Sequence, residues 1–189
     1  MNAINKIDDL FLAAECQQIP AVYAGIGARK TPRDVLALMT CIARRLDLAG
    51  WTLRSGGADG ADQAFVWGSE HHEIFTPWPR FNGARVATRL MNPTVKAMAI
   101  AAEVHPNWSL LTEPVKKLHA RNVHQVLGAD CTSPCSMVIC WTPDGSTGVT
   151  SQRTGGTGQA IRIAAAHKIP IFNLQRHDHL AAWRAICAL

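Results

Sequence analysis

The sequence lacks the segments that export a chain or anchor it in a bilayer. It contains neither a secretory leader nor an apolar run that would span a membrane. Its first sixteen residues carry Asp8, Asp9 and Glu15 between apolar residues at helical spacing, which predicts an amphipathic helix. We therefore expect a cytoplasmic protein with no membrane partner.

Spacings typical of metal sites are also missing. None of the six cysteines forms a CxxC pair, and the eight histidines show neither HExxH nor HxxEH spacing. In a chain without an export signal, the cysteines should mostly be reduced and buried. We accordingly predict no metal site and no cofactor.

The chain has no Lys- or Arg-dense tail, internal repeat, low-complexity tract or interdomain linker. Its 189 residues, 48% hydrophobic and 17% charged, are enough to bury a core. We predict a single domain over residues 1–189, with the helix in residues 1–18 as an extension. The net charge of +5 favours an anionic partner, which could be a nucleotide, a nucleic acid or an acidic surface.

Three glycine-rich loops, each preceded by an apolar run, are the most informative feature that is present. They occupy residues 25–29 (GIGAR), 55–62 (SGGADGAD) and 154–159 (TGGTGQ). Glycine lets backbone N–H groups approach an anion, and the N-terminus of a following helix is partly positive. Three such loops at the carboxyl ends of parallel strands predict a nucleotide-sized site.

Strands and helices are predicted to alternate along the chain. The apolar runs predict strands at residues 21–25, 51–54, 73–76, 136–141 and 169–174, and helical spacing predicts helices between them. Thr31 is predicted to cap the helix that follows the first strand, with Pro32 at its first position. Residues 80–92 have no clear period and are predicted to form an ordered loop. The fold class is therefore α/β, a Rossmann-like three-layer sandwich around a mostly parallel five-stranded sheet.

These loops resemble those of known families. Residues 23–29 and 54–62 resemble the signature of DNA-processing protein A, and Gly155 to Gly158 are similar to the phosphate loop of the lonely-guy phosphoribohydrolases. Both families belong to the SLOG superfamily of Rossmann-like nucleotide binders. From about residue 22 to 174 the chain also resembles small stand-alone members often carried by bacteriophages. The resemblance to the phage-borne members implies that the chain sequesters or alters a nucleotide signal, such as one used in host defence. We expect a homo-oligomer whose partner is a nucleotide-type small molecule.

The sequence departs from both families in ways that bear on activity. Arg162 stands where the lonely-guy pattern has a glutamate. An arginine at this position suits phosphate binding better than it suits stabilising a cationic ribosyl centre. No winged-helix region or arginine-rich groove is evident, and the six tryptophans are dispersed, so we expect only weak, salt-sensitive nucleic-acid binding. We expect a binding protein rather than an enzyme. The alternatives are an N-glycosidic-bond hydrolase and a single-stranded-DNA-binding recombination mediator.

Several candidate residues also have a purely structural interpretation. Asp59 and Asp62 could stabilise a helix dipole or contact a ribose or base, and Trp78 could stack on a base or fill a packing gap. The polar patch of Arg121, Asn122, His124 and Gln125 could form a solvated helix face, and the alternative is that Arg121 and Asn122 reach over the site. Asp144 is primarily a turn former. No catalytic residue is assigned, and the candidate ligand-binding residues are Gly25, Gly27, Arg29, Ser55, Gly56, Gly57, Asp59, Asp62, Trp78, Arg121, Asn122, Asp144, Gly155, Gly156, Thr157, Gly158 and Arg162.

Overall fold

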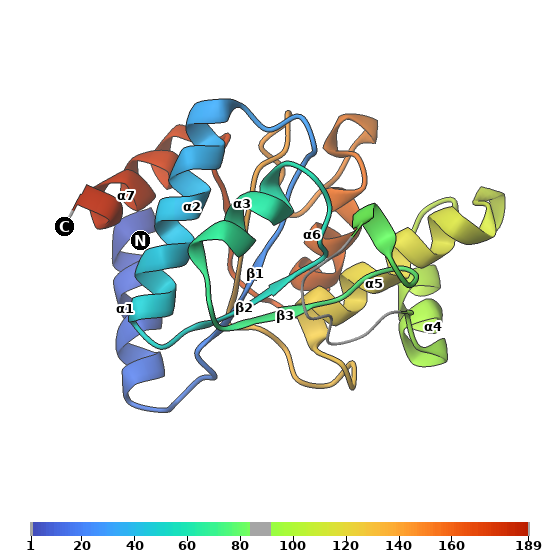
Figure 1. The fold of residues 1–189 in the computed structure, drawn as a ribbon, viewed down its shortest axis with the longest axis horizontal. Coiled ribbons are helices and arrows are strands. Elements are labelled where there is room, and N and C mark those ends of the chain that lie inside the picture. The colour runs from blue at the N-terminus through green and yellow to red at the C-terminus, as the bar shows by residue number, and fades with distance from the viewer. Residues whose placement is uncertain (1, 84–91, 189) are drawn as a thin grey trace.

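The computed structural model describes residues 2–83 and 92–188 and is built on a five-stranded, entirely parallel sheet (Figure 1). The strand order is β3-β2-β1-β4-β5, so the order reverses between β1 and β4. This topology confirms the predicted Rossmann-like fold. The strands are β1 Val22–Gly25, β2 Thr52–Ser55, β3 His72–Ile74, β4 Met137–Cys140 and β5 Ile171–Asn173.

Helices cover both faces of the sheet (Figure 1). One face carries α1 Ala3–Glu15, α2 Arg33–Leu48, α3 Ala61–Gly68 and α7 His177–Ala188. The other carries α4 Val95–Val104, α5 Glu113–Leu127 and α6 Thr157–Ala166. Short 3₁₀ segments occur at Phe81–Gly83, Trp108–Leu110 and Gln152–Thr154. In residues 2–83 and 92–188, no helix has the length and apolar character needed to cross a membrane.

Two hydrophobic cores lie on opposite faces of the sheet. Successive strand residues point to opposite faces, so Met137 and Ile139 of β4 enter the first core, whereas Val138 and Cys140 enter the second. Ile7 of α1 is fully buried in the first core, so the N-terminal helix packs on the sandwich. The six cysteines are free thiols, three of them buried and three partly or fully exposed. The prediction that most cysteines are buried is therefore too broad.

The predicted cap of the second helix is wrong. The helix begins at Arg33 with Pro32 as its N-cap residue, and the Thr31 side chain makes no capping bond. Its hydroxyl instead donates to the Ala28 carbonyl at 2.7 Å, which closes the loop after β1. In the region predicted to be an ordered loop, residues 81–83 form a 3₁₀ turn, and residues 84–91 lie outside the described residues.

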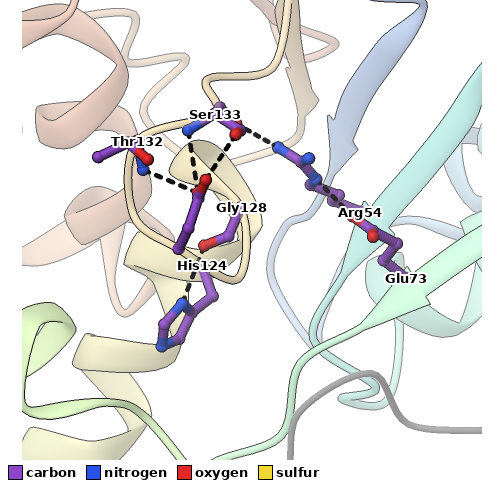
Figure 2. A network of polar contacts seen from close by, with 7 residues as sticks. Arg54, Glu73, His124, Gly128, Thr132 and Ser133 are labelled. Carbon is purple, nitrogen blue, oxygen red and sulfur yellow. Dashed lines mark hydrogen bonds and ion pairs between the residues drawn. The ribbon is translucent and has the colours of Figure 1, made fainter.

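A polar network fixes the C-terminal end of α5 to the sheet (Figure 2). Arg54 of β2 donates through Nε to Glu73 of β3 at 2.7 Å and through Nη1 to the Ser133 carbonyl at 2.6 Å. At the end of α5, Nδ1 of His124 lies 2.9 Å from the Gly128 carbonyl. The Arg54 contacts therefore tie the loop after α5 to β2 and β3, next to the helix whose polar residues are described below.

Candidate functional site

A pocket of about 430 Å³ lies at the carboxyl ends of the central strands. Its lining comes from residues 26–30 after β1, from Ala58 and Asp62 after β2, and from residues 143 and 153–157 after β4. Side chains of α5 complete the wall. The three loops that the sequence singled out therefore meet around one cavity, at the point where strand order reverses and α/β proteins bind ligands.

The pocket brings together about half of the predicted ligand-binding residues. Those that line it are Gly27, Arg29, Asp62, Arg121, Asn122, Gly155, Gly156 and Thr157. The remaining candidates lie outside the lining, and they are Gly25, Ser55, Gly56, Gly57, Asp59, Trp78, Asp144, Gly158 and Arg162.

Asp62 joins the loops to each other. It lies in the first turn of α3, is buried, and accepts hydrogen bonds from the backbone N–H groups of Gly27, Gly56 and Ala58. Its Oδ2 lies 3.5 Å from Nη1 of Arg121 on α5. Burial raises the pKa of this carboxyl, and the Arg121 charge and the N–H donors oppose that rise. Asp62 therefore ties the first two glycine loops to α5.

Arg121 is the buried cation of the pocket. Its Nη1 donates to the Gly56 carbonyl, and its guanidinium carbon lies 5.4 Å from the centre of the Phe81 ring. Burial lowers the pKa of Arg121, and Asp62 raises it. A Cβ atom at Gly56 would overlap the guanidinium, so glycine is needed there for Arg121 to approach. The Nε atom of Arg121 is buried without a partner among the described residues.

The polar residues of α5 point into the protein. Arg121, Asn122, His124 and Gln125 are each no more than 9% exposed, so the interpretation as a solvated helix face is wrong. Asn122 Nδ2 donates to the Gly156 carbonyl at 3.0 Å, which braces the loop before α6. Arg121 and Asn122 thus give partners to backbone carbonyls of two loops at the carboxyl ends of the strands, whereas His124 contacts the Gly128 carbonyl at the end of its own helix.

The N-terminus of α6 opens into the pocket. Its N-cap residue is Gly156, so no side chain caps the helix. A Cβ atom at Gly155 or Gly156 would meet nothing within 4 Å, and Gly155 has a positive φ of 65°. Arg29 and Arg153 are exposed and line the same cavity. An uncapped helix N-terminus beside cationic side chains is suited to an anion.

The outlying residues of the first two loops have structural contacts. A Cβ atom at Gly25 would clash with Phe65 and Leu53, so this glycine allows close core packing. The Ser55 hydroxyl donates to the Gly25 carbonyl at 2.7 Å, and Gly57 adopts a positive φ of 65° in the turn that follows. Ligand contact by these residues stays a prediction.

The other outlying candidates have defined partners as well. Asp59 accepts a hydrogen bond from Asn82 at 2.6 Å, and Trp78 packs edge-on against Phe81 with ring centres 5.3 Å apart. Arg162 donates to Thr150 and to Gln159, each at 2.6 Å. Gly158 follows Thr157 in the first turn of α6, outside the lining.

Asp144 organises the third loop. Its carboxylate accepts hydrogen bonds from the hydroxyls of Thr142, Ser151 and Thr154. Although burial acts in the opposite direction, these donors lower the pKa of Asp144. The structure thus bears out its role as a turn former.

Outside the three glycine-rich loops, sequence reasoning missed the lining residues Lys30, Val115, Leu118, His119, Gln125, Pro143 and Arg153. The four on α5 recur at spacings of three and four around Arg121 and Asn122, so a shared helix face was the signal that could have found them. Within residues 2–83 and 92–188, no cluster of His, Cys, Asp or Glu is arranged to hold a metal ion.

A solved structure has the same fold. DNA processing protein A from Helicobacter pylori, studied for its unique single-stranded DNA binding mode, aligns with a TM-score of 0.56 and 17% identity. The alignment covers 94% of this chain and 74% of that one. No family model matches the chain, and comparison with curated proteins gives no match. The likeness shows a Rossmann-like α/β fold.

Proposed function

We propose that this chain binds a nucleotide or a nucleotide-derived small molecule in the pocket. The observation that carries the proposal is the open N-terminus of α6, which faces a cavity of about 430 Å³. Arg29, Lys30 and Arg153 supply positive charge around it, and charge-assisted bonds to phosphate are among the strong ones. Val115 and Leu118 line the same cavity and offer apolar surface to a base or ribose.

The same site favours holding the ligand over cleaving it. Among the described residues that line the pocket, the only carboxylate is that of Asp62, and it is occupied by three N–H groups and Arg121. Among these lining residues, no free carboxylate is therefore left to stabilise the positive charge that develops as a glycosidic bond breaks. We accordingly assign the chain a sequestering role, of the anti-defence type implied by its resemblance to phage-borne SLOG members. A cytoplasmic homo-oligomer is part of the same proposal.

The first test identifies the ligand and localises it. Small molecules released by denaturing the purified protein are identified by mass spectrometry, and nucleotides are then screened for thermal stabilisation. Gly156→Val should abolish that stabilisation without unfolding the protein, because Gly156 has helical φ and ψ and its Cβ would enter open space at the helix N-terminus.

Gly148→Val is the matched control for this test. A Cβ at Gly148 also meets nothing within 4 Å, but this residue does not line the pocket. The control should keep the full stabilisation. Equal stabilisation of both variants by nucleotide would show that the ligand does not bind at the α6 N-terminus.

Single-stranded DNA is the second candidate ligand. It is favoured by the structural likeness to DNA processing protein A from Helicobacter pylori, whose single-stranded DNA binding mode has been described. The exposed Arg29, Lys30 and Arg153 could contact successive phosphates.

Oligonucleotide length and salt separate the two candidates. If DNA is the main ligand, affinity rises with strand length and falls steeply with salt, because each phosphate contact releases counterions. We expect weak binding that is lost at physiological salt. Tight binding to long strands that survives competition by mononucleotides would make DNA the ligand.

A further inference from the structure

A second group of basic side chains lies beside the pocket, where three elements meet. His105 follows α4, His119 lies on α5, and Arg162 lies on α6. The rings of His105 and His119 have centres 4.6 Å apart. His119 also lines the pocket, so this corner is continuous with the cavity.

The positive charge of this corner is not balanced by a described carboxylate. The Arg162 guanidinium donates to Thr150 and Gln159, which are both neutral, and its Nε is buried without a partner among the described residues. The ionisable groups that act on His119 are His105, Arg162 and Arg121, all of them basic. An unbalanced basic cluster beside a ligand pocket is suited to an anionic group.

His119 also carries an unsatisfied polar atom. Its Nδ1 is buried and has no hydrogen-bond partner among the described residues. Burial and then the charges of His105, Arg162 and Arg121 lower the pKa of His119 to about 4, and burial also lowers the pKa of His105. Burial thus favours the neutral form of both rings in the free protein. A bound anion would reverse the balance of charge and favour their protonated forms.

We propose that His105, His119 and Arg162 form a second anion subsite, so that the preferred ligand is a nucleotide carrying two separate phosphate groups. This inference rests on the proposed nucleotide function. The first phosphate lies at the α6 N-terminus near Arg153, and the second lies at the corner between α4, α5 and α6.

Calorimetry with paired ligands tests the second subsite. The four ribonucleoside 5′-monophosphates are compared with the matching 3′,5′-bisphosphates. For the preferred base, the bisphosphate should bind roughly tenfold to a hundredfold more tightly than the monophosphate, which is the scale of a charge-assisted contact. Arg162→Gln and His119→Gln should each remove most of this gain, so that the ratio of bisphosphate affinity to monophosphate affinity falls toward one.

Arg153→Gln is the matched control, because Arg153 lines the pocket beside the α6 N-terminus. It should weaken both ligands by a similar factor and so leave their affinity ratio unchanged. Arg162 also supports the loop at Thr150, so melting temperatures are measured for all variants. His119 lies on a different helix, so His119→Gln still tests the second subsite if Arg162→Gln is poorly folded.

Histidine ring signals in NMR titrations give an independent measure. The pKa of His119 should rise by at least one unit with the bisphosphate and much less with the monophosphate. Equal affinity of the wild-type protein for the two ligands, or an unchanged ratio in both folded variants, would overturn the subsite and leave the nucleotide function intact. Failure of every nucleotide to bind would overturn both.

Discussion

At the scale of single residues, His119 links burial to pH-dependent stability. Its pKa is lowered to about 4, against 6.5 for an ordinary histidine. The unfolded chain therefore binds a proton at this site between pH 6.5 and 4 that the folded chain does not bind. Stability contributed by the neutral ring is present above pH 6.5 and is lost as the pH falls through that window.

We predict that His119→Gln makes the free energy of unfolding less dependent on pH between 6.5 and 4. Between pH 6.5 and 4, the free energy of unfolding of the variant should fall by about 1–2 kcal/mol less than that of the wild-type protein. This figure allows for the partial solvent exposure of the ring. Urea denaturation at a series of pH values measures it. His177→Gln, the same substitution on the exposed surface of α7, is the control. A wild-type slope in His119→Gln would contradict the prediction.

At the scale of elements, periodicity was sufficient to predict the order of strands and helices. The strand predicted at residues 136–141 is observed at Met137–Cys140, and the helix predicted between the last two strands is observed at Thr157–Ala166. Both have strong signals, an apolar run and a regular helical spacing. The start of α2 was misplaced because Thr31 resembles a cap residue in sequence, whereas its hydroxyl bonds to the loop after β1.

The candidate site was less predictable than the elements. Convergence of the three loops follows from parallel topology, so residues such as Gly27 and Gly156 could be placed near each other. The inward orientation of the Arg121 side chain could not be predicted from the sequence, because a polar helix face is normally solvated. Only the tertiary contacts with Asp62 and the Gly56 carbonyl explain its burial.

At the scale of the whole molecule, the Asp62–Arg121 pair connects the two layers of helices. Asp62 belongs to α3, which packs in the first core, and Arg121 belongs to α5, which packs in the second. The contact passes beyond the carboxyl ends of the strands, where the pocket lies. Loss of one partner would leave a buried charge without compensation and would also release the loops that Asp62 holds.

We predict that Asp62→Asn lowers the free energy of unfolding by roughly 3–5 kcal/mol, the cost of breaking a buried ion pair. Arg121→Met should be similarly destabilising, since it leaves the buried carboxylate unpaired. The double variant should be less destabilised than the sum of the two, by about 1–3 kcal/mol, because neither charge then remains alone. Urea denaturation of the four proteins completes the cycle, and additive losses would mean that the two side chains stabilise the molecule independently. Since the pair borders the pocket, both single variants should also lose nucleotide-induced stabilisation at concentrations where the wild-type protein is saturated.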